Sequence, residues 1–496
     1  MSIQARPTPG RRPRAPRRHV EIDLPVRQRV PSGPWDARRE SIGALLQRLR
    51  AAQGWSQLRL ATKLCDVSGM PTVSRHEVSR WEREERVPSS FWRQWLAVVL
   101  DAPLEQLEAA VAAADGRLDR TVRRGRQLRF WRPLAAPDLL AALDHGGIRD
   151  VQQLAHAWLA GPPGVSPASD RGAADGESTP CDGTGWDALG RLEARLGRLR
   201  RIDDVVGGLD LAGTVDRALR EAIAVLPAIG DGSQRRALQV VAGQAQLAGW
   251  VHADAGDYPS ARRAYRVALQ AAAGAGDRRL AAYVLAALSH QSLAAQDAQE
   301  ALLLARTGMA GLPDGPGCTL TRVLLLHRAS LAAARLGNRP DAEAALVHAE
   351  RLADRTGPDG DPQWLYWLTE DELTAMTGRC LAAIGRPLRA ARLLAARVGG
   401  GGGGPRSAAL YGGWLARSLV ALGEVEEACR VASRALLDAV SVGSVRAVDS
   451  VRHLHPVLLR HRDLPAVREY EVQAEAAFAR MAGVRLPRFA ADCSRE

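Results

Sequence analysis

Apolar side chains recur every three to four residues along most of this chain, which is the spacing of one face of an α-helix. One such stretch lies between Ser41 and Gly54, and its apolar residues are Ile42, Leu45, Leu46 and Leu49. A serine before the first apolar residue and a glycine after the last are typical helix ends, so the pattern predicts a helix over 42–53. Aromatic residues make up only 4% of the chain, which favours helix packing over sheets. We therefore expect an all-α fold.

Two more short helices are predicted directly after the first. Ser56 can cap a helix over Gln57–Leu64, whose inward residues are expected to be Leu58, Ala61 and Leu64. Ser74 and Glu77 have the spacing of a capping box, in which each side chain accepts a hydrogen bond from the other residue's backbone amide. The helix that they begin is expected to end near Glu82, with Val78 and Trp81 inward.

A fourth and a fifth helix complete this first group. Pro88 and the serine pair Ser89-Ser90 start a helix that runs through Leu100, and Pro103 opens the next one. Proline and serine are favoured at the beginning of helices, where backbone amides have no partner within the helix. The sequence therefore predicts a compact bundle of five short helices before residue 115.

The second half of the chain repeats one pattern. An Ala- and Leu-rich helix, a Gly or polar turn and a second helix recur about every 40 residues, a period that indicates a repeat architecture. The turns are Gly256-Asp257, Gln296-Asp297, Gly337-Asn338, Gly385-Arg386, Gly423-Glu424 and Arg462-Asp463. A single helix pair cannot bury its apolar face, so we expect the pairs to stack into an α-solenoid. The architecture resembles tetratricopeptide (TPR) repeats, with a period longer than their usual 34 residues.

Composition divides the chain into six segments. Two of them are rich in Arg or in Gly, Pro and Ser, as disordered arms and linkers are. The hexaglycine Gly399–Gly404 is expected to be a loop between two repeats. The expected segments are a disordered basic arm (1–37), the short-helix bundle (38–115), a basic helical connector (116–160) with two helices broken at Gly146-Gly147, a flexible linker (161–186), the TPR-like domain (187–482) and a tail (483–496).

The positive charge is confined to the first quarter of the chain. The net charge is +12 overall, and residues 1–132 hold 26 basic against 14 acidic residues, so they account for all of it. A polyanion is the simplest partner for a segment of this kind. Arg117, Arg120, Arg123, Arg124, Arg126, Arg129 and Arg132 form one dense basic cluster within it.

Several kinds of chemistry find no support in the sequence. The six cysteines are scattered without a CxxC pair, and Lys63, which is the only lysine, lies in no phosphate-binding glycine loop. His453, His455 and His461 are close in sequence, but they lack a carboxylate or cysteine at a metal-ligand spacing. We expect no enzyme activity, no cofactor and no metal. The sequence shows neither an apolar run of about 18 residues that could span a membrane nor a secretory signal. We therefore expect a cytoplasmic, nucleoid-associated protein without membrane contact.

The short-helix bundle is similar to the XRE class of phage-repressor-like regulators. The resemblance covers about 60 residues and rests on one ordered string of residues. It comprises Leu49-Arg50, Gly54-Trp55-Ser56-Gln57, Leu60-Ala61, the run from Ser74 to Glu82, and Pro88-Ser89. In this family the third helix of the bundle enters the major groove of DNA.

The resemblance implies a set of DNA contacts and one structural pair. The start of the third helix would meet base edges, and Gln57 would touch a phosphate. The implied DNA-binding residues are Gln57, Ser74, Arg75, His76, Ser79 and Arg80. Arg50 and Glu82 match an ion pair that supports the bundle. The family has about two residues between the second helix and the next cap, whereas here Cys65–Val73 intervene. Either the second helix runs on or a loop bulges.

The repeats contain one cluster of aromatic residues, which lies just before Glu370-Asp371-Glu372. It consists of Trp364, Tyr366 and Trp367. Packing of a helix pair is the first interpretation of this group, and lining of a ligand or peptide site is the second.

The sequence thus predicts a transcriptional regulator that binds double-stranded DNA as a homodimer. Its repeats would form a long concave surface that senses a ligand or binds a peptide or protein partner. The alternative is a protein-interaction scaffold whose helix-turn-helix docks a protein or binds DNA without sequence specificity.

Overall fold

The structure is a computed structural model that describes residues 41–68, 73–114, 135–145, 151–160, 183–354, 361–399 and 404–482. Every regular element in these ranges is a helix, so the expected all-α fold is confirmed. The predictions for the basic arm, the cluster from Arg117 to Arg132, most of the 161–186 linker and the tail fall outside the described residues. Within the described helices, no segment is both long and apolar enough to cross a membrane.

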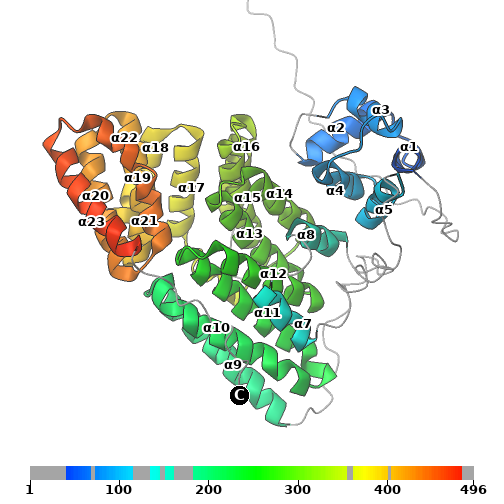
Figure 1. Ribbon diagram of the computed structural model, residues 1–496, viewed down its shortest axis with the longest axis horizontal. Helices are drawn as coiled ribbons and strands as arrows, with labels where there is room; N and C mark the ends of the chain where they lie inside the picture. Colours follow the sequence, from blue (N-terminus) through cyan, green and yellow to red (C-terminus); the bar gives the residue numbers. More distant parts are fainter. Residues whose placement is uncertain are drawn as a thin grey trace, which may run out of the picture.

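Five short helices form the N-terminal bundle (Figure 1). They are α1 (Ile42–Ala52), α2 (Gln57–Ser68), α3 (Arg75–Glu82), α4 (Ser90–Val99) and α5 (Leu104–Ala114). The second helix is longer than the range 57–64, as one of the two alternatives allowed, and one residue of its predicted inward face was wrong. It continues for one more turn, to Ser68, and Leu58 is 60% exposed while Leu60 is fully buried in its place.

Two further helices, α7 (Ala136–His145) and α8 (Val151–Ala160), agree with the two helices expected around Gly146-Gly147. They do not stand alone as a connector. Instead α7 packs against α10 and α12, and α8 packs against α12 and α14 of the main helical array. Trp158 of α8 lies so close to Gly311 that any side chain there would overlap its ring.

The main array consists of antiparallel helix pairs, in which each helix packs on the next along the chain. The pairs are α9 (Gly183–Asp203) with α10 (Gly208–Val225), α11 (Asp231–Asp254) with α12 (Tyr258–Gly274), α13 (Arg278–Ala294) with α14 (Ala298–Gly311), α15 (Thr319–Arg335) with α16 (Arg339–Ala353), α17 (Glu370–Ile384) with α18 (Pro387–Gly399), and α19 (Gly404–Leu422) with α20 (Val425–Val442). The C-terminal elements are α21 (Val445–Arg452), α22 (His455–Leu458), η4 (Leu459–His461) and α23 (Pro465–Ala482), and two short 3-10 turns are η2 (Leu226–Ala228) and η3 (Gln363–Leu365).

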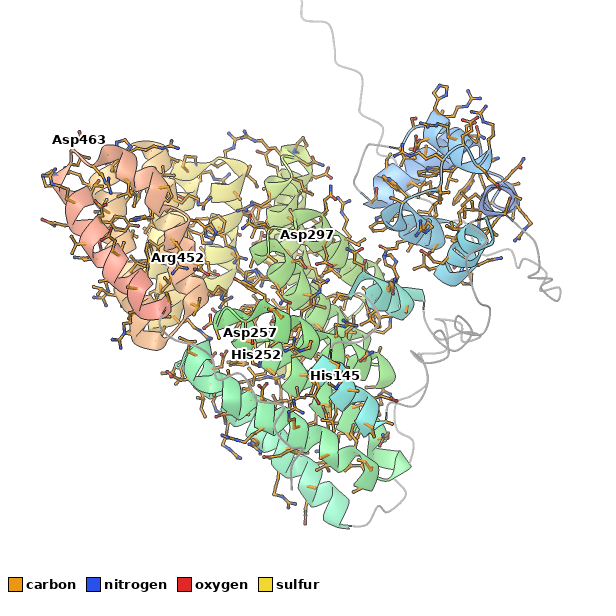
Figure 2. All side chains as sticks on the ribbon, in the orientation of Figure 1. His145, His252, Asp257, Asp297, Arg452 and Asp463 are labelled. Carbon is orange, nitrogen blue, oxygen red and sulfur yellow. The ribbon has the colours of Figure 1, made fainter. Side chains whose placement is uncertain are left out.

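Five of the six predicted turns join the two helices of a pair. Asp257, Asp297 and Asn338 each accept a hydrogen bond from the amide three residues on, which caps the second helix of its pair. Figure 2 shows Asp257 and Asp297 at such helix starts. The sixth turn, near Asp463, instead precedes α23 as a single helix. Helix pairs are therefore present at the expected positions, and the resemblance to TPR repeats stays a prediction.

The two ends of the array touch each other. The Leu209 amide donates to the carbonyl of Gly443 at 3.4 Å, and the Ser444 hydroxyl donates to Asp254 Oδ1 at 2.8 Å. A Cβ at Gly207 would lie 1.9 Å from the carbonyl oxygen of Val442. The turn between α9 and α10 is thus seated against the turn between α20 and α21, as Figure 1 shows. The expected long concave surface is closed at this point.

The N-terminal bundle rests on the outer side of the array. Leu303 of α14 is 2% exposed and belongs to the hydrophobic cluster of the bundle. Trp95 of α4 meets His156 of α8 edge to face, with ring centroids 6.4 Å apart. In Figure 1, α4 and α5 lie on the side of the bundle toward α8, and α3 lies on the other side.

Candidate DNA interface and ligand cavity

The third helix of the bundle presents a polar face to solvent. Val78 and Trp81 of α3 are buried, at 0% and 1% exposure. Arg75, His76 and Arg80 are exposed on the opposite face. Arg75 and His76 engage no other side chain among the residues that the structure describes. Their hydrogen-bond donors are therefore available to a ligand, and the DNA contacts that the XRE resemblance implied stay a prediction.

The cap of α3 differs in part from the expected capping box. The Ser74 hydroxyl accepts from the Glu77 amide at 3.3 Å. Glu77 does not return the bond, because its carboxylate lies 2.9 Å from Arg86 and 3.7 Å from Arg80. The reciprocal half of the prediction was wrong. Ser79 is half-buried beside these residues, so the exposed positions at the start of the helix are Ser74, Arg75 and His76.

Arg50 and Glu82 form the predicted structural pair. The guanidinium holds the carboxylate through Nε at 2.5 Å and Nη2 at 3.0 Å, and Nη1 donates to the Trp55 carbonyl at 2.6 Å. The side chains are only 15% and 5% exposed. The hydrogen bond that Arg50 donates to Glu82 raises the pKa of Arg50. These contacts tie α1, the turn after it and the end of α3 together.

Gln57 also belongs to this network, which the sequence did not indicate. Its Nε2 donates to Glu82 Oε2 at 2.9 Å. An amide nitrogen carries two hydrogens, so one remains for another acceptor. The predicted phosphate contact of Gln57 stays a prediction, but Glu82 already fixes where that second hydrogen points.

The long connection between α2 and α3 is partly helical. Besides the extra turn of α2, the Cys65 thiol donates to the Val73 carbonyl at 3.3 Å, and Val73 is 6% exposed. The helix therefore runs on, as one of the two expected alternatives, and the chain is anchored again just before Ser74. Residues 69–72 lie outside the described ranges.

A cavity of about 1040 Å³ lies inside the array. Its walls come from the first helices of the successive pairs, α9, α11, α13, α15, α17 and α19, and from α21. This row of helices is the side toward which the array curves before its ends meet (Figure 1). A pocket of this size is at the upper end of the range for small-molecule sites, which is about 300–1,000 Å³.

The cavity wall carries more positive than negative charge. Eight arginines line it, against four acidic residues. The arginines are Arg200, Arg328, Arg335, Arg379, Arg397, Arg406, Arg417 and Arg446, and the acidic residues are Asp203, Asp204, Glu372 and Asp449. The wall therefore has an excess of four positive charges before any ligand is considered.

Some of these arginines are held by carboxylates. Arg406 forms a two-armed pair with Asp203, at 2.8 and 3.0 Å. Arg397 donates to Glu372 at 3.1 Å, and the Tyr411 hydroxyl donates to the other oxygen of the same carboxylate. The first pair joins α19 to α9, which are distant in sequence, and the contacts of Glu372 join α17 to α18 and α19, so together they hold the wall of the cavity.

Arg446 is also held, at the point where the array closes. Its Nε donates to Asp254 Oδ1 at 3.0 Å, and its guanidinium stacks 4.2 Å from the ring centroid of Trp250. Burial alone would raise the pKa of Asp254, but the charges of Arg446 and Arg406 hold it below its ordinary value. Arg446 Nη1 also contacts Nε2 of His290 at 3.1 Å. Burial lowers the pKa of His290 well below its ordinary value, so this neutral ring accepts at Nε2.

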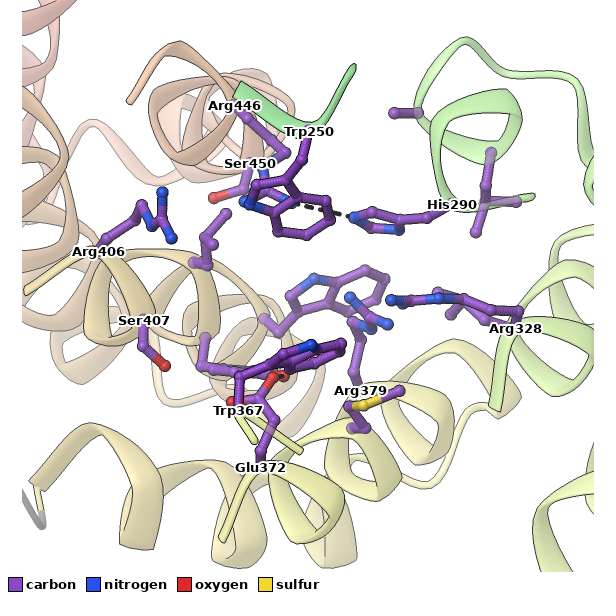
Figure 3. A pocket seen from close by; sticks show the side chains of 18 of the residues that line it. Trp250, His290, Arg328, Trp367, Glu372, Arg379, Arg406, Ser407, Arg446 and Ser450 are labelled. Atoms are coloured by element: carbon purple, nitrogen blue, oxygen red, sulfur yellow. Dashed lines mark hydrogen bonds between the residues drawn. The ribbon is translucent and has the colours of Figure 1, made fainter. Parts of the chain in front are cut away.

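Arg328 and Arg379 differ from the paired arginines. They are 5% and 8% exposed, and no carboxylate or carbonyl accepts from either guanidinium within the described residues. The Nε of Arg328, and the Nε and Nη2 of Arg379, are shut off from solvent without a hydrogen-bond partner. Figure 3 shows the two side chains reaching toward one another from α15 and α17.

The aromatic group that the sequence singled out lies on the same wall. Trp364, Tyr366 and Trp367 all line the cavity, and the two tryptophans also pack against the core. The Tyr366 hydroxyl donates to Asp204 at 2.7 Å. The two tryptophans therefore contribute to packing, as in the first interpretation, and the lining of a ligand or peptide site stays a prediction.

No known protein family, curated protein or solved structure matches this chain. Its function must be inferred from the geometry of the two sites.

The three neighbouring histidines do not converge. His453 borders the cavity, and its Nδ1 contacts the Asp449 carbonyl at 2.6 Å. His455 packs between Tyr470 and Phe478 instead. Within the described part of the chain, no three His, Cys, Asp or Glu residues are placed to hold a metal ion.

The cavity arginines are the functional residues that sequence analysis missed. A signal was present for Arg328, which is the only charged residue between Val323 and Ala333, a stretch of α15 in which only His327 and Ser330 are otherwise polar. A lone charge in an all-round apolar helix must be buried, and a buried charge needs a partner. The location of that partner could not be derived from local sequence.

Proposed function

We propose that this protein is a sequence-specific DNA-binding transcriptional regulator. In this proposal α3 enters the major groove, and Arg75, His76, Ser79 and Arg80 meet base edges. The observation that carries it is the exposed face of α3, where Arg75 and His76 engage no other side chain among the described residues while Val78 and Trp81 anchor the helix from behind. An arginine in this position can donate two hydrogen bonds to guanine.

The supporting network fits this role. Glu82 holds Arg50 and Gln57 together at the end of α3, so the angle between α2 and α3 is fixed before DNA is met. A preorganised recognition helix loses less entropy on binding. Ser74 and Gln57 lie at the starts of α3 and α2, where backbone and side-chain amides commonly contact phosphates.

The helical array supplies the regulatory input in this proposal. A single helix-turn-helix covers one half-site, and such domains usually act in pairs about one DNA turn apart. We therefore propose a homodimer on a palindromic operator. The basic segment before residue 132 adds attraction to the phosphates.

Binding to duplex DNA by the full-length protein and its Arg75→Ala variant tests the proposal. Genomic fragments selected by the purified protein would first define the preferred site. Arg75→Ala should then cost about 1–3 kcal/mol on that site and little on an unrelated duplex. The matched control is Arg389→Ala, which removes an exposed arginine of α18 and should change neither affinity.

Two results would contradict the proposal. Equal losses on both duplexes would show that Arg75 is only a backbone contact. Selection that yields no preferred sequence would favour a scaffold that binds DNA without specificity or docks a protein.

A further inference from the structure

We infer that the cavity in the helical array binds a small organic anion with a flat apolar body, whose anionic group is held between Arg328 and Arg379. Only the regulatory effect of such a ligand rests on the proposed function. The binding itself depends on the cavity alone.

Burial of the two guanidinium groups costs free energy. Removing a guanidinium from water is unfavourable unless a counter-charge or full hydrogen bonding replaces the water. Arg328 and Arg379 are both more than nine-tenths buried, and neither forms an ion pair or a hydrogen bond within the described residues. The charge of Glu372 acts on Arg328 more weakly than burial and the charge of Arg379 do. A structure that keeps two such groups side by side is destabilised by them, and this is common where a site is built for a ligand.

The guanidinium groups of Arg328 and Arg379 also repel each other. Burial, together with the charge of Arg379, lowers the pKa of Arg328 to about 9. Arg328 is therefore still charged at neutral pH, and the charge of the neighbouring Arg379 opposes it. An anion between them would remove the repulsion and supply the missing acceptors. Guanidinium groups bind carboxylate, phosphate and sulfonate oxygens through paired hydrogen bonds.

The neighbouring carboxylates already accept hydrogen bonds from other residues. Glu372 is the acidic residue of α17 on this wall, and Arg397 and Tyr411 occupy its two oxygens. Asp203 is taken up in the same way by Arg406. Arg328 and Arg379 therefore have no ion-pair partner within the described residues, whereas Arg397, Arg406 and Arg446 each have one.

The apolar part of the ligand follows from the rest of the wall. Trp364, Trp367 and Met376 line the cavity close to Arg379 in sequence, and Trp250 lines it from α11. Figure 3 shows Trp367 beside the two arginines. Indole faces bind flat apolar groups by stacking. Trp364 Nε1 is buried without a partner, which leaves a donor for a polar atom of the ligand.

The experiment compares two probes with the same aromatic skeleton and different charge. 8-Anilinonaphthalene-1-sulfonate is a flat anion, and N-phenyl-1-naphthylamine is the neutral molecule without the sulfonate. Binding of each to the full-length protein is followed by fluorescence, in the absence of DNA. The wild-type protein should bind the sulfonate at least tenfold more tightly than the amine.

Variants then locate the anionic group. Arg328→Met and Arg379→Met, made separately, should each weaken the sulfonate at least tenfold and change the amine less than twofold. Both should also raise the Tm of the protein without ligand, because each removes an uncompensated buried charge. Arg389→Met, which alters an exposed arginine outside the cavity, should leave both affinities and the Tm unchanged.

The opposite results would overturn the inference. Equal affinity of the wild type for the two probes would show that the cavity does not select anions, and this test requires no variant. A lower Tm in both arginine variants with unchanged sulfonate binding would make the arginines structural. Failure of DNA binding would contradict the proposed function and leave the probe measurements unaffected.

Discussion

At the scale of the residue, one carboxylate organises the N-terminal bundle. Glu82 accepts from Arg50 and Gln57, which come from α1 and α2, while it stands at the end of α3. Nothing else among the described side chains joins these three helices through a single group. Its 5% exposure means that loss of the carboxylate would leave a guanidinium in a place that water reaches poorly.

We predict that Glu82→Ala destabilises the bundle by about 3–5 kcal/mol, because one partner of a largely buried ion pair is left uncompensated. Hydrogen exchange of the α1 and α3 amides in the full-length protein measures this locally. Glu85→Ala is the matched control, because Glu85 pairs with Arg83 in solvent. This variant should change the stability of the bundle by no more than about 0.5 kcal/mol. Unchanged exchange in Glu82→Ala with lost DNA affinity would refute the structural role.

At the scale of the element, local sequence was sufficient wherever a local interaction decides the structure. Helix starts at Ser41, Asp257 and Asp297 could be predicted because a side chain caps its own helix. The inward face of α2 could not be predicted. Leu58 and Leu60 are two residues apart and lie on different faces, and only packing against the other helices of the bundle selects Leu60. The same reason applies to the cavity, whose walls come from helices far apart in the sequence.

Closure of the array also depends on residues whose role is not local. Gly207 has φ −76°, a conformation that any residue adopts, so no turn rule marks it. It must be glycine because the Val442 carbonyl occupies the place of a Cβ. Gly208 is equally crowded by the backbone of α11. Contacts of this kind cannot be predicted until the distant segment is known.

We predict that Gly207→Ala lowers the free energy of unfolding by about 1–3 kcal/mol, as overpacking does, and weakens binding of the aromatic sulfonate. Gly213→Ala is the control. It lies on the same helix, its added Cβ would meet nothing within 4 Å, and it should stabilise the protein by about 0.4–1 kcal/mol. Urea unfolding and probe fluorescence measure both effects. Equal behaviour of the two variants would show that the closing contact contributes no stability.

At the scale of the whole molecule, the bundle and the array meet at a small apolar junction of Trp95, His156 and Leu303. The α14 helix that carries Leu303 is paired with α13, and α13 lines the cavity with Tyr283 and His290. The cavity and the N-terminal bundle are therefore two helices apart. Burial lowers the pKa of His156 to about 4, so the junction is built around a neutral imidazole.

This junction should make stability depend on pH. A histidine whose pKa is lowered in the folded state adds its full share to the free energy of unfolding above its ordinary pKa of 6.5. This share is lost as the pH falls from 6.5 toward 4. We predict that His156→Phe reduces the loss of stability between about pH 7 and about pH 4.5 by about 2–3 kcal/mol. His348→Phe, at an exposed position of α16, is the control. Identical pH profiles of His156→Phe and the wild type would contradict the prediction.

The contact between the two ends of the array also limits how such a protein can vary. In an open stack, a helix pair can be duplicated or lost and only its neighbours change. Here one added pair between α13 and α18 would displace α20 by about 8–10 Å, the distance between packed helices. The hydrogen bond from Ser444 to Asp254 would then be lost. The circumference of the cavity therefore fixes the number of helix pairs, and insertions can be accommodated only in turns on the outer side.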